Sequence, residues 1–289
     1  MTMADDSEGS SLLHKGWMVV ADAVGHLNDD DGWAMASHVA LSALMAIFPF
    51  VIFIAALAGF IGNEPLAGQA ADFLFEIWPA EVAGPISREV HRVLTGASTS
   101  LLTVSAVIAI YLASNGVEAV RTALNRAYRS NDNRSFLFRR SQSLVFVAVG
   151  AVASLTMAFL GVLGPRTFAR FAEFFPTLLP FEATFAYLRV GVTSALLIVV
   201  LTAAHLWLPS NRPPATRLWP GIAITLLLWA LAARVFAAYL ARFANYTATY
   251  AGLASLVTAI FFLYLIALIM IFGGEFNAAL GRLRAGKLR

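Results

Sequence analysis

The chain has 289 residues, of which 59% are hydrophobic and only 13% are charged, and its mean hydropathy is +0.74. Soluble domains carry about 25% charged residues, so this composition excludes an ordinary water-soluble globular protein. The net charge of +3 is small, and the absence of cysteine excludes disulfides, thiolate metal sites and cysteine nucleophiles.

Six long apolar stretches, poor in charge, follow one another along the chain. A helix needs about 20 residues to cross a hydrocarbon core about 30 Å thick, and lipid offers the backbone no hydrogen bonds, so each stretch is predicted to be helical. Pro49 in the first span predicts a kink, which is either a packing feature or a hinge. The predicted spans are residues 37–61, 97–117, 143–163, 185–208, 218–240 and 251–274. The fold class is therefore an all-α polytopic membrane protein.

The segments around these spans are short. Residues 1–11 are predicted to be a disordered tail, and residues 12–27 an amphipathic helix at the interface. Two further short amphipathic helices are expected in the external loop 64–94, and residues 166–185 alternate Arg with Phe as suits the headgroup layer. Residues 12–281 then form one membrane domain, followed by a basic tail, 282–289.

The distribution of basic residues predicts the orientation. Six spans place both termini on one side, and thirteen of the 20 Lys and Arg residues fall on that side, against five on the other side and two within spans. Because loops rich in Lys and Arg stay in the cytoplasm, both termini are predicted to be cytoplasmic.

Polar residues from four spans reach the same depth, at the cytoplasmic ends of the spans. Glu118, Arg121 and Asn125 also share one helix face, because they are three and four residues apart. Two interpretations are open: a polar vestibule that binds a substrate or a proton, or ordinary interfacial polarity with a structural Glu118–Arg121 pair. The vestibule candidates are His38, Asn115, Glu118, Arg121, Asn125, His205 and Glu275.

Four arginines are candidates for a second site near the external surface. Arg189 and Arg234 lie about one turn below it in adjacent spans, and Arg166 and Arg170 lie nearby. Either the buried arginines extend outward to the headgroups, or the group binds an anion or a lipid phosphate, whose geometry suits Arg.

The residues of a catalytic centre do not come together in the sequence. The five histidines are scattered without metal-binding spacing, and neither a Walker motif nor a G-x-S-x-G elbow occurs. The basic segment 134–140 is explained by topology. The sequence therefore predicts no catalytic residue, no cofactor, no metal and no nucleic-acid partner.

Four motifs carry a family resemblance. They are S-H-V-A-L-S-A-L at 37–44 before Phe48-Pro49, N-G-V-E-A-V-R-T-A-L-N-R-A-Y at 115–128, W-L-P-S-N-R at 207–212, and Y-A-G at 250–252 through F-G-G-E at 272–275. In this order, from about Trp17 to Leu280, the chain resembles the YihY/BrkB family of bacterial inner-membrane proteins, once labelled ribonuclease BN. His38 departs from the pattern, which has Asn or a similar residue there. The resemblance implies six spans, cytoplasmic termini and the bacterial inner membrane, and it suggests transport of lipid or another envelope component.

Three functions remain in view. The first is a transporter or lipid-handling protein that acts on membrane lipid or a small anionic substrate. The second is a non-catalytic scaffold or assembly partner that uses the 64–94 loop as its contact surface, with homo-oligomerisation left open, and the third is a membrane-bound nuclease. A continuous cavity lined by Asn115, Glu118, Arg121 and His205 would favour transport, whereas a solid bundle would favour the scaffold.

Overall fold

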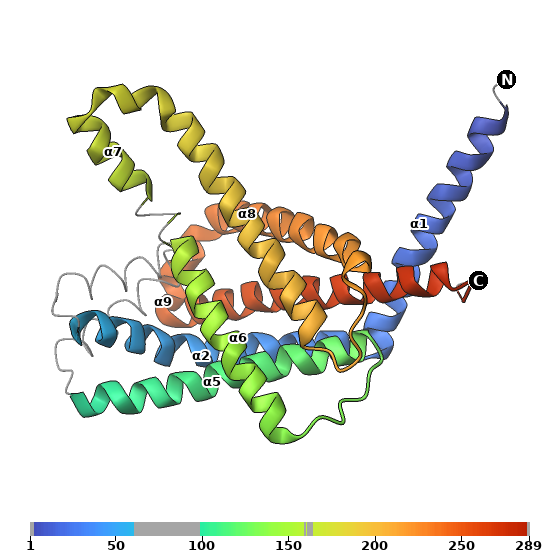
Figure 1. Cartoon of the computed structure of the whole chain (residues 1–289), viewed down its shortest axis with the longest axis horizontal. Helices are drawn as coiled ribbons and strands as arrows, with labels where there is room; N and C mark the ends of the chain where they lie inside the picture. Colours follow the sequence, from blue (N-terminus) through green and yellow to red (C-terminus); the bar gives the residue numbers. More distant parts are fainter. Residues whose placement is uncertain (1–2, 61–98, 159, 161–163, 288–289) are drawn as a thin grey trace.

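The computed structural model describes residues 3–60, 99–158, 160 and 164–287, and no strand occurs in these ranges (Figure 1). This confirms the all-α fold. The elements are α1 (Met3–Asp29), α2 (Gly32–Phe60), α5 (Thr99–Ala127), α6 (Phe136–Ala158), α7 (Gly164–Phe174), η2 (Pro176–Phe181), α8 (Glu182–Trp207), η3 (Ala215–Arg217) and α9 (Trp219–Arg284).

Within the part of the chain that the structure describes, five helical segments are long and apolar enough to cross a membrane, and α2 adds a shorter apolar part, Gly32–Ile47. The five are Ala106–Ala127, Phe136–Ser154, Glu182–Trp207, Trp219–Tyr239 and Val257–Arg284. Large apolar side chains on their outer faces, such as Val107, Val145 and Leu227, are more than half exposed. Lipid would cover such faces, so the protein is a membrane protein.

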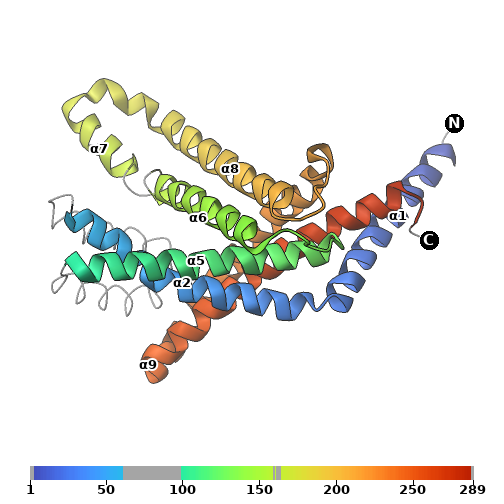
Figure 2. The same ribbon diagram turned by 60° about the horizontal axis from the view of Figure 1, so that its bottom comes forward.

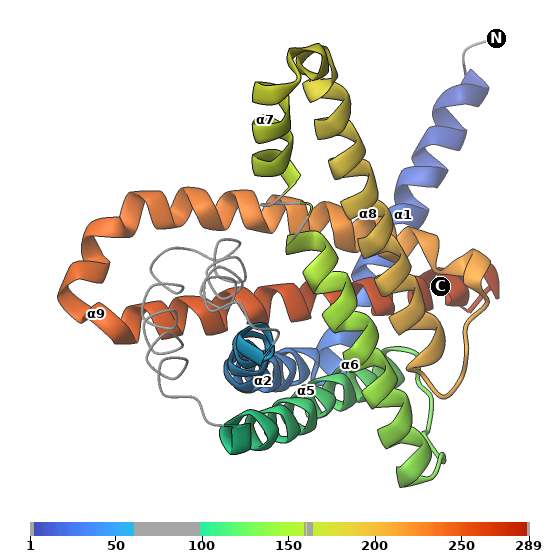
Figure 3. The same ribbon diagram turned by 60° about the vertical axis from the view of Figure 1, so that its left-hand side comes forward.

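Helix α9 contains two spans in one continuous helical stretch. Figure 3 shows it running outward, turning back and returning beside its own first arm. Glycines bring the arms together: a Cβ at Gly273 would lie 2.0 Å from the Thr225 hydroxyl, and one at Gly221 would lie 2.2 Å from the Gly273 oxygen. Asn277 stabilises this contact between the two arms, because its side-chain oxygen accepts a hydrogen bond of 2.8 Å from the Gly221 backbone. Small residues permit this close approach.

The core lies where α2, α5 and the second arm of α9 meet. Ala36 and Val39 of α2 pack with Ala123 of α5 and Ile271 of α9. Helix α1 packs its apolar face against the end of α9, and α6 and α8 lie on the other side of α5 (Figure 2).

The turn between α1 and α2 depends on two residues. Asp31 has a φ of 54°, a left-handed conformation that Asp tolerates better than most residues. A Cβ at Gly32 would lie 2.4 Å from the Leu27 side chain, so only glycine fits. The turn thereby brings Asp30 and Asp31 back to the end of α5.

The termini differ from the prediction. Helix α1 begins at Met3, within the segment 1–11 expected to be a disordered tail, and α9 continues through the predicted span end at residue 274 to Arg284. Acidic residues early in α1 suit the positive end of a helix dipole, and Val19 and Ala23 of α1 pack against Ala279 near the end of α9. The 64–94 loop lies outside the described residues. Within 166–185 the structure has α7, η2 and the start of α8.

Candidate functional site

The polar residues of the predicted vestibule lie at one end of the bundle, which we call the arginine-rich end. It comprises the last turns of α5, the loop 128–135, the start of α6, the end of α8 and the end of α9. The structure distributes these candidates over several separate contacts and leaves His38 exposed.

Glu118 and Arg121 join α5 to α6. Arg121 is 1% exposed, forms an ion pair with Glu118, and donates a hydrogen bond of 3.0 Å to the Ser143 hydroxyl. Ser143 in turn donates to the Glu118 carboxylate at 2.7 Å. Arg121 also donates to the Arg139 backbone oxygen and to Gln142. A buried guanidinium with acceptors on both α5 and α6 holds these two helices together.

Asn125 joins two loops. Its side-chain oxygen accepts hydrogen bonds of 2.8 Å from the Ser130 hydroxyl and from the Ser210 backbone, and its amide donates to Asp132. Asp132 pairs with Arg134, which donates to the Leu208 backbone oxygen at 2.6 Å. The hydrogen bonds from Arg134 lower the pKa of Asp132 to about 2.

His205 is fully buried near the end of α8. Its Nδ1 lies 3.0 Å from the Leu201 backbone oxygen, which only accepts, so this nitrogen carries the proton. Its Nε2 has no hydrogen-bond partner and faces Gly274, and the Tyr128 ring meets the imidazole edge-on.

Glu275 on α9 is 1% exposed, and its carboxyl group lies within hydrogen-bonding reach of the Asp30 side chain. Sequence reasoning missed Asp30, because it lies in the α1–α2 turn, far along the chain from Glu275. Arg129 approaches the same aspartate, with its Nη2 3.5 Å from Asp30 Oδ2.

Asn115 and His38 lie apart from these contacts. Asn115 accepts a hydrogen bond of 2.8 Å from Arg140, whose guanidinium also lies 4.6 Å from the Tyr111 ring centre. His38 is exposed on α2. The side chains of Arg121, Asn125, His205 and Glu275 are buried in helix contacts, so they fit the structural interpretation better than an open vestibule.

One open polar pocket of about 590 Å³ lies between the loops at this end. Its two arginines already face acidic groups, Arg129 facing Asp30 and Arg134 facing Asp132. These pairs weaken its attraction for an anion. Its lining is Arg129, Ser130, Asn131, Asn133, Arg134, Ser210 and Asn211.

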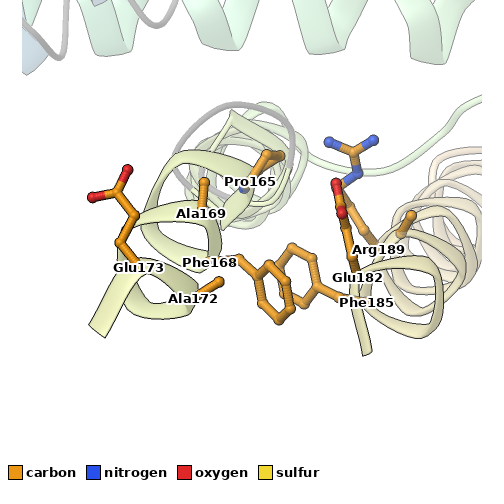
Figure 4. Close-up of a pocket in the computed structure, with 9 residues that line it drawn as sticks. Pro165, Phe168, Ala169, Ala172, Glu173, Glu182, Phe185 and Arg189 are labelled. Carbon is orange, nitrogen blue, oxygen red and sulfur yellow. The ribbon is translucent and has the colours of Figure 1, made fainter. Parts of the chain in front are cut away.

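A different pocket lies between α7 and α8, with a volume of about 420 Å³ (Figure 4). Its floor is apolar: the Phe168 and Phe185 rings stack with centroids 4.9 Å apart, and alanines and Pro165 surround them. Its charged groups are Glu173 from α7 and Glu182 and Arg189 from α8. Glu182, Phe185 and Arg189 are spaced three and four residues apart, so α8 presents them on one face.

Of the candidate arginines whose side chains the structure describes, only Arg189 lines this pocket. Arg170 is exposed on α7, and the side chain of Arg166 on the same helix lies outside the description. Arg234 is exposed on α9. Sequence reasoning did not propose Phe168, Glu173, Glu182 or Phe185 as site residues, although the alternation of Arg with Phe in residues 166–185 indicated that this region suits the headgroup layer.

Within the described residues, no group of three or more His, Asp or Glu side chains is arranged to hold a metal ion.

Comparison with known proteins places residues 23–289 in a family model described as "Virulence factor BrkB". A ribonuclease-like protein of Bacillus subtilis (strain 168), YfkH, is 29% identical over 252 residues, which cover 86% of this chain and 90% of that protein. A UPF0761 membrane protein of Alteromonas mediterranea is 24% identical over 263 residues, which cover 88% of this chain and 84% of that protein. Another, of Rhodospirillum centenum, is 24% identical over 273 residues, 93% of this chain but 59% of that longer protein. No solved structure matches the chain significantly.

Proposed function

We propose that this chain, which belongs to the BrkB family of membrane proteins, handles membrane lipid and holds the polar end of a lipid in the α7–α8 pocket. The observation that carries this proposal is the combination, in one pocket, of a stacked aromatic floor and the Arg189 guanidinium.

The pocket has the composition of an amphiphile site. Ligand pockets are mostly apolar with a few convergent polar groups, and they commonly measure about 300–1,000 Å³. At about 420 Å³ this pocket could enclose a headgroup and the first part of an acyl chain, but not a whole two-chain lipid. The remaining chain would extend into the bilayer along the exposed apolar face of α8, which includes Leu188 and Val199.

The charged residues of the pocket favour a headgroup that carries both a positive and a negative charge. Arg189 suits a phosphate, while Glu173 and Glu182 add two carboxylates to the same lining. Among the lining residues that the structure describes, a purely anionic headgroup would face two carboxylates and one guanidinium. An amine-bearing phospholipid headgroup matches both signs, so we propose this class over a small anion.

In this proposal the arginine-rich end has a structural role. Its Arg121 and Asn125 are held in contacts between helices and loops, so we assign lipid contact to the α7–α8 pocket at the other end of α8. We further propose the bacterial inner membrane as the location, with both termini in the cytoplasm. The scaffold alternative relies on residues 64–94, which lie outside the described residues.

Lipid movement in proteoliposomes tests the function. The purified protein would be reconstituted with a headgroup-amine phospholipid or phosphatidylglycerol, each bearing a fluorescent acyl chain, and transbilayer movement would be followed by quenching of the outer leaflet. Arg189→Gln and Phe168→Ala should each slow movement of the amine-bearing lipid at least about tenfold, the effect of losing about 1.4 kcal/mol of binding.

Matched controls come from the same elements. Arg234→Gln removes an arginine exposed on α9, and Phe171→Ala removes a phenylalanine that is 54% exposed on α7 and absent from the lining. Both controls should behave like wild type. Equal loss in pocket and control variants, or no lipid movement above protein-free liposomes, would refute the proposal.

A further inference from the structure

The carboxyl group of Glu275 lies within an otherwise apolar stripe of α9. Ile271, one turn earlier, packs in the core with α2 and α5, and Ala279, one turn later, packs against Val19 and Ala23 of α1. Glu275 itself is 1% exposed, and its Oε2 has no hydrogen-bond partner. A buried carboxylate without a partner is costly, so this position requires an explanation.

Asp30 is an acidic residue whose side chain interacts with Glu275. It lies in the α1–α2 turn, its side chain is 29% exposed, and its Oδ2 also lacks a hydrogen-bond partner. The two carboxyl groups lie within hydrogen-bonding reach of each other. Two ionised carboxylates only accept, so a hydrogen bond between them requires a proton on one of them.

We propose that Asp30 and Glu275 form a proton-binding site, in which one proton held between the two carboxyl groups ties the α1–α2 turn to α9. Asp30 Oδ2 and Glu275 Oε2 each lack a hydrogen-bond partner, so each carboxyl group has an oxygen free to share that proton. Asp30 reaches solvent and Glu275 does not, so the proton enters and leaves through Asp30.

The charged and titratable groups around Asp30 and Glu275 are consistent with one bound proton. Arg129, at the end of α5, lies 3.5 Å from Asp30 Oδ2 and offsets one negative charge. Arg282 on α9 is held by Asp22 of α1 at 2.9 Å, and Arg126 binds the Asp30 backbone oxygen and Asp31. His205 of α8 faces the neighbouring Gly274, and the Tyr128 hydroxyl accepts a hydrogen bond from Asn277.

Loss of the proton would leave two neighbouring negative charges, which Arg282 and Arg129 offset only in part. Two neighbouring carboxylates repel each other strongly in a poorly solvated site. The site therefore couples proton binding to the docking of α1 and its turn on α9. This inference is independent of the lipid pocket, which uses other residues at the opposite end of α8.

Infrared difference spectroscopy tests the site directly. Between about pH 5 and about pH 9, a range that spans the titration of perturbed carboxyls, the full-length wild-type protein in detergent should lose the carbonyl stretch of one protonated carboxylic acid. Glu275→Gln and Asp30→Asn should each abolish this signal. Asp29→Asn, which changes an exposed carboxylate at the end of α1, should retain it. Absence of the signal in wild type, or its persistence in Glu275→Gln, would overturn the proposal.

A second measurement separates proton binding from mere packing. The amide of Glu275→Gln can donate to the Asp30 carboxylate without any proton from solvent. The thermal unfolding midpoint of wild type should therefore fall as the pH rises, whereas that of Glu275→Gln should show no such fall. The same fall in both proteins would contradict the site. If Glu275→Gln does not fold, Asp30→Asn provides the same comparison from the exposed turn.

Discussion

Arg134, in the loop after α5, donates a hydrogen bond of 2.6 Å to the backbone oxygen of Leu208, which lies 74 residues further along at the end of α8. Gln142 of α6 donates to the preceding backbone oxygen, that of Trp207, also at 2.6 Å. The loop 128–135 and the start of α6 thus satisfy carbonyl groups at the end of α8 that have no partner within the helix.

Acid should loosen this loop contact. The hydrogen bonds from Arg134 hold the pKa of Asp132 at about 2, below its ordinary value of 3.8, so the pair stabilises the fold fully above the ordinary value. Its contribution should fall as the pH drops through about 2. Hydrogen exchange of residues 128–135 should accelerate in that range in wild type, whereas Asp132→Asn should exchange faster already at neutral pH. Identical exchange profiles for the two proteins would contradict the role of the pair.

Arg121→Met should destabilise the α5–α6 contact. The change removes the charged hydrogen bonds to Glu118 and Ser143 and leaves the carboxylate without its cation, at a cost of about 2–3 kcal/mol. The free energy of unfolding in mixed detergent micelles measures this. Arg126→Met, which breaks an exposed pair with Asp31 at 3.4 Å, is the matched control and should cost less than about 1 kcal/mol. Equal costs would show that Arg121 is not a structural link.

Gly273→Ala should prevent the two arms of α9 from packing. The added Cβ would lie 2.0 Å from the Thr225 hydroxyl and 2.9 Å from the Gly221 oxygen, and the backbone of the second contact cannot yield. Size-exclusion chromatography should show aggregated rather than monodisperse protein. At Gly150 a Cβ meets nothing within 4 Å, so Gly150→Ala should remain monodisperse. A monodisperse Gly273→Ala protein would mean that the two arms of α9 lie further apart than in this structure.

Single-cysteine labelling tests the proposed orientation, and the absence of native cysteine makes every introduced thiol unique. Asn211→Cys, exposed at the arginine-rich end, should react with a membrane-impermeant reagent only in inverted vesicles. Phe174→Cys at the end of α7 should react only in spheroplasts. The reverse pattern would contradict the assignment from basic residues.

The helices could be predicted from the sequence because length and hydropathy alone determine which segments suit a bilayer. The continuation of α5 through Glu118 and Arg121 also follows from local spacing, as does their contact, since residues three apart lie on one helix face. The structure contains that pair.

The partners of the other candidates depend on how helices rotate and cross, which no local pattern encodes. Asn125 shares a face with Arg121, yet it binds Ser210 of a distant loop. Glu275 meets Asp30 only because the α1–α2 turn folds back beside α9. The lining of the α7–α8 pocket likewise required the angle between two helices, although the aromatic residues of 166–185 indicated where to look.

The most direct test of the account is the number of phospholipids that the protein retains in native mass spectra after detergent purification. Wild type and Arg234→Gln should retain one amine-bearing phospholipid, and Arg189→Gln should lose it, because Arg189 lines the pocket and Arg234 does not. Retention of the same lipid by Arg189→Gln and by Phe168→Ala, or no specific lipid on wild type, would contradict the account.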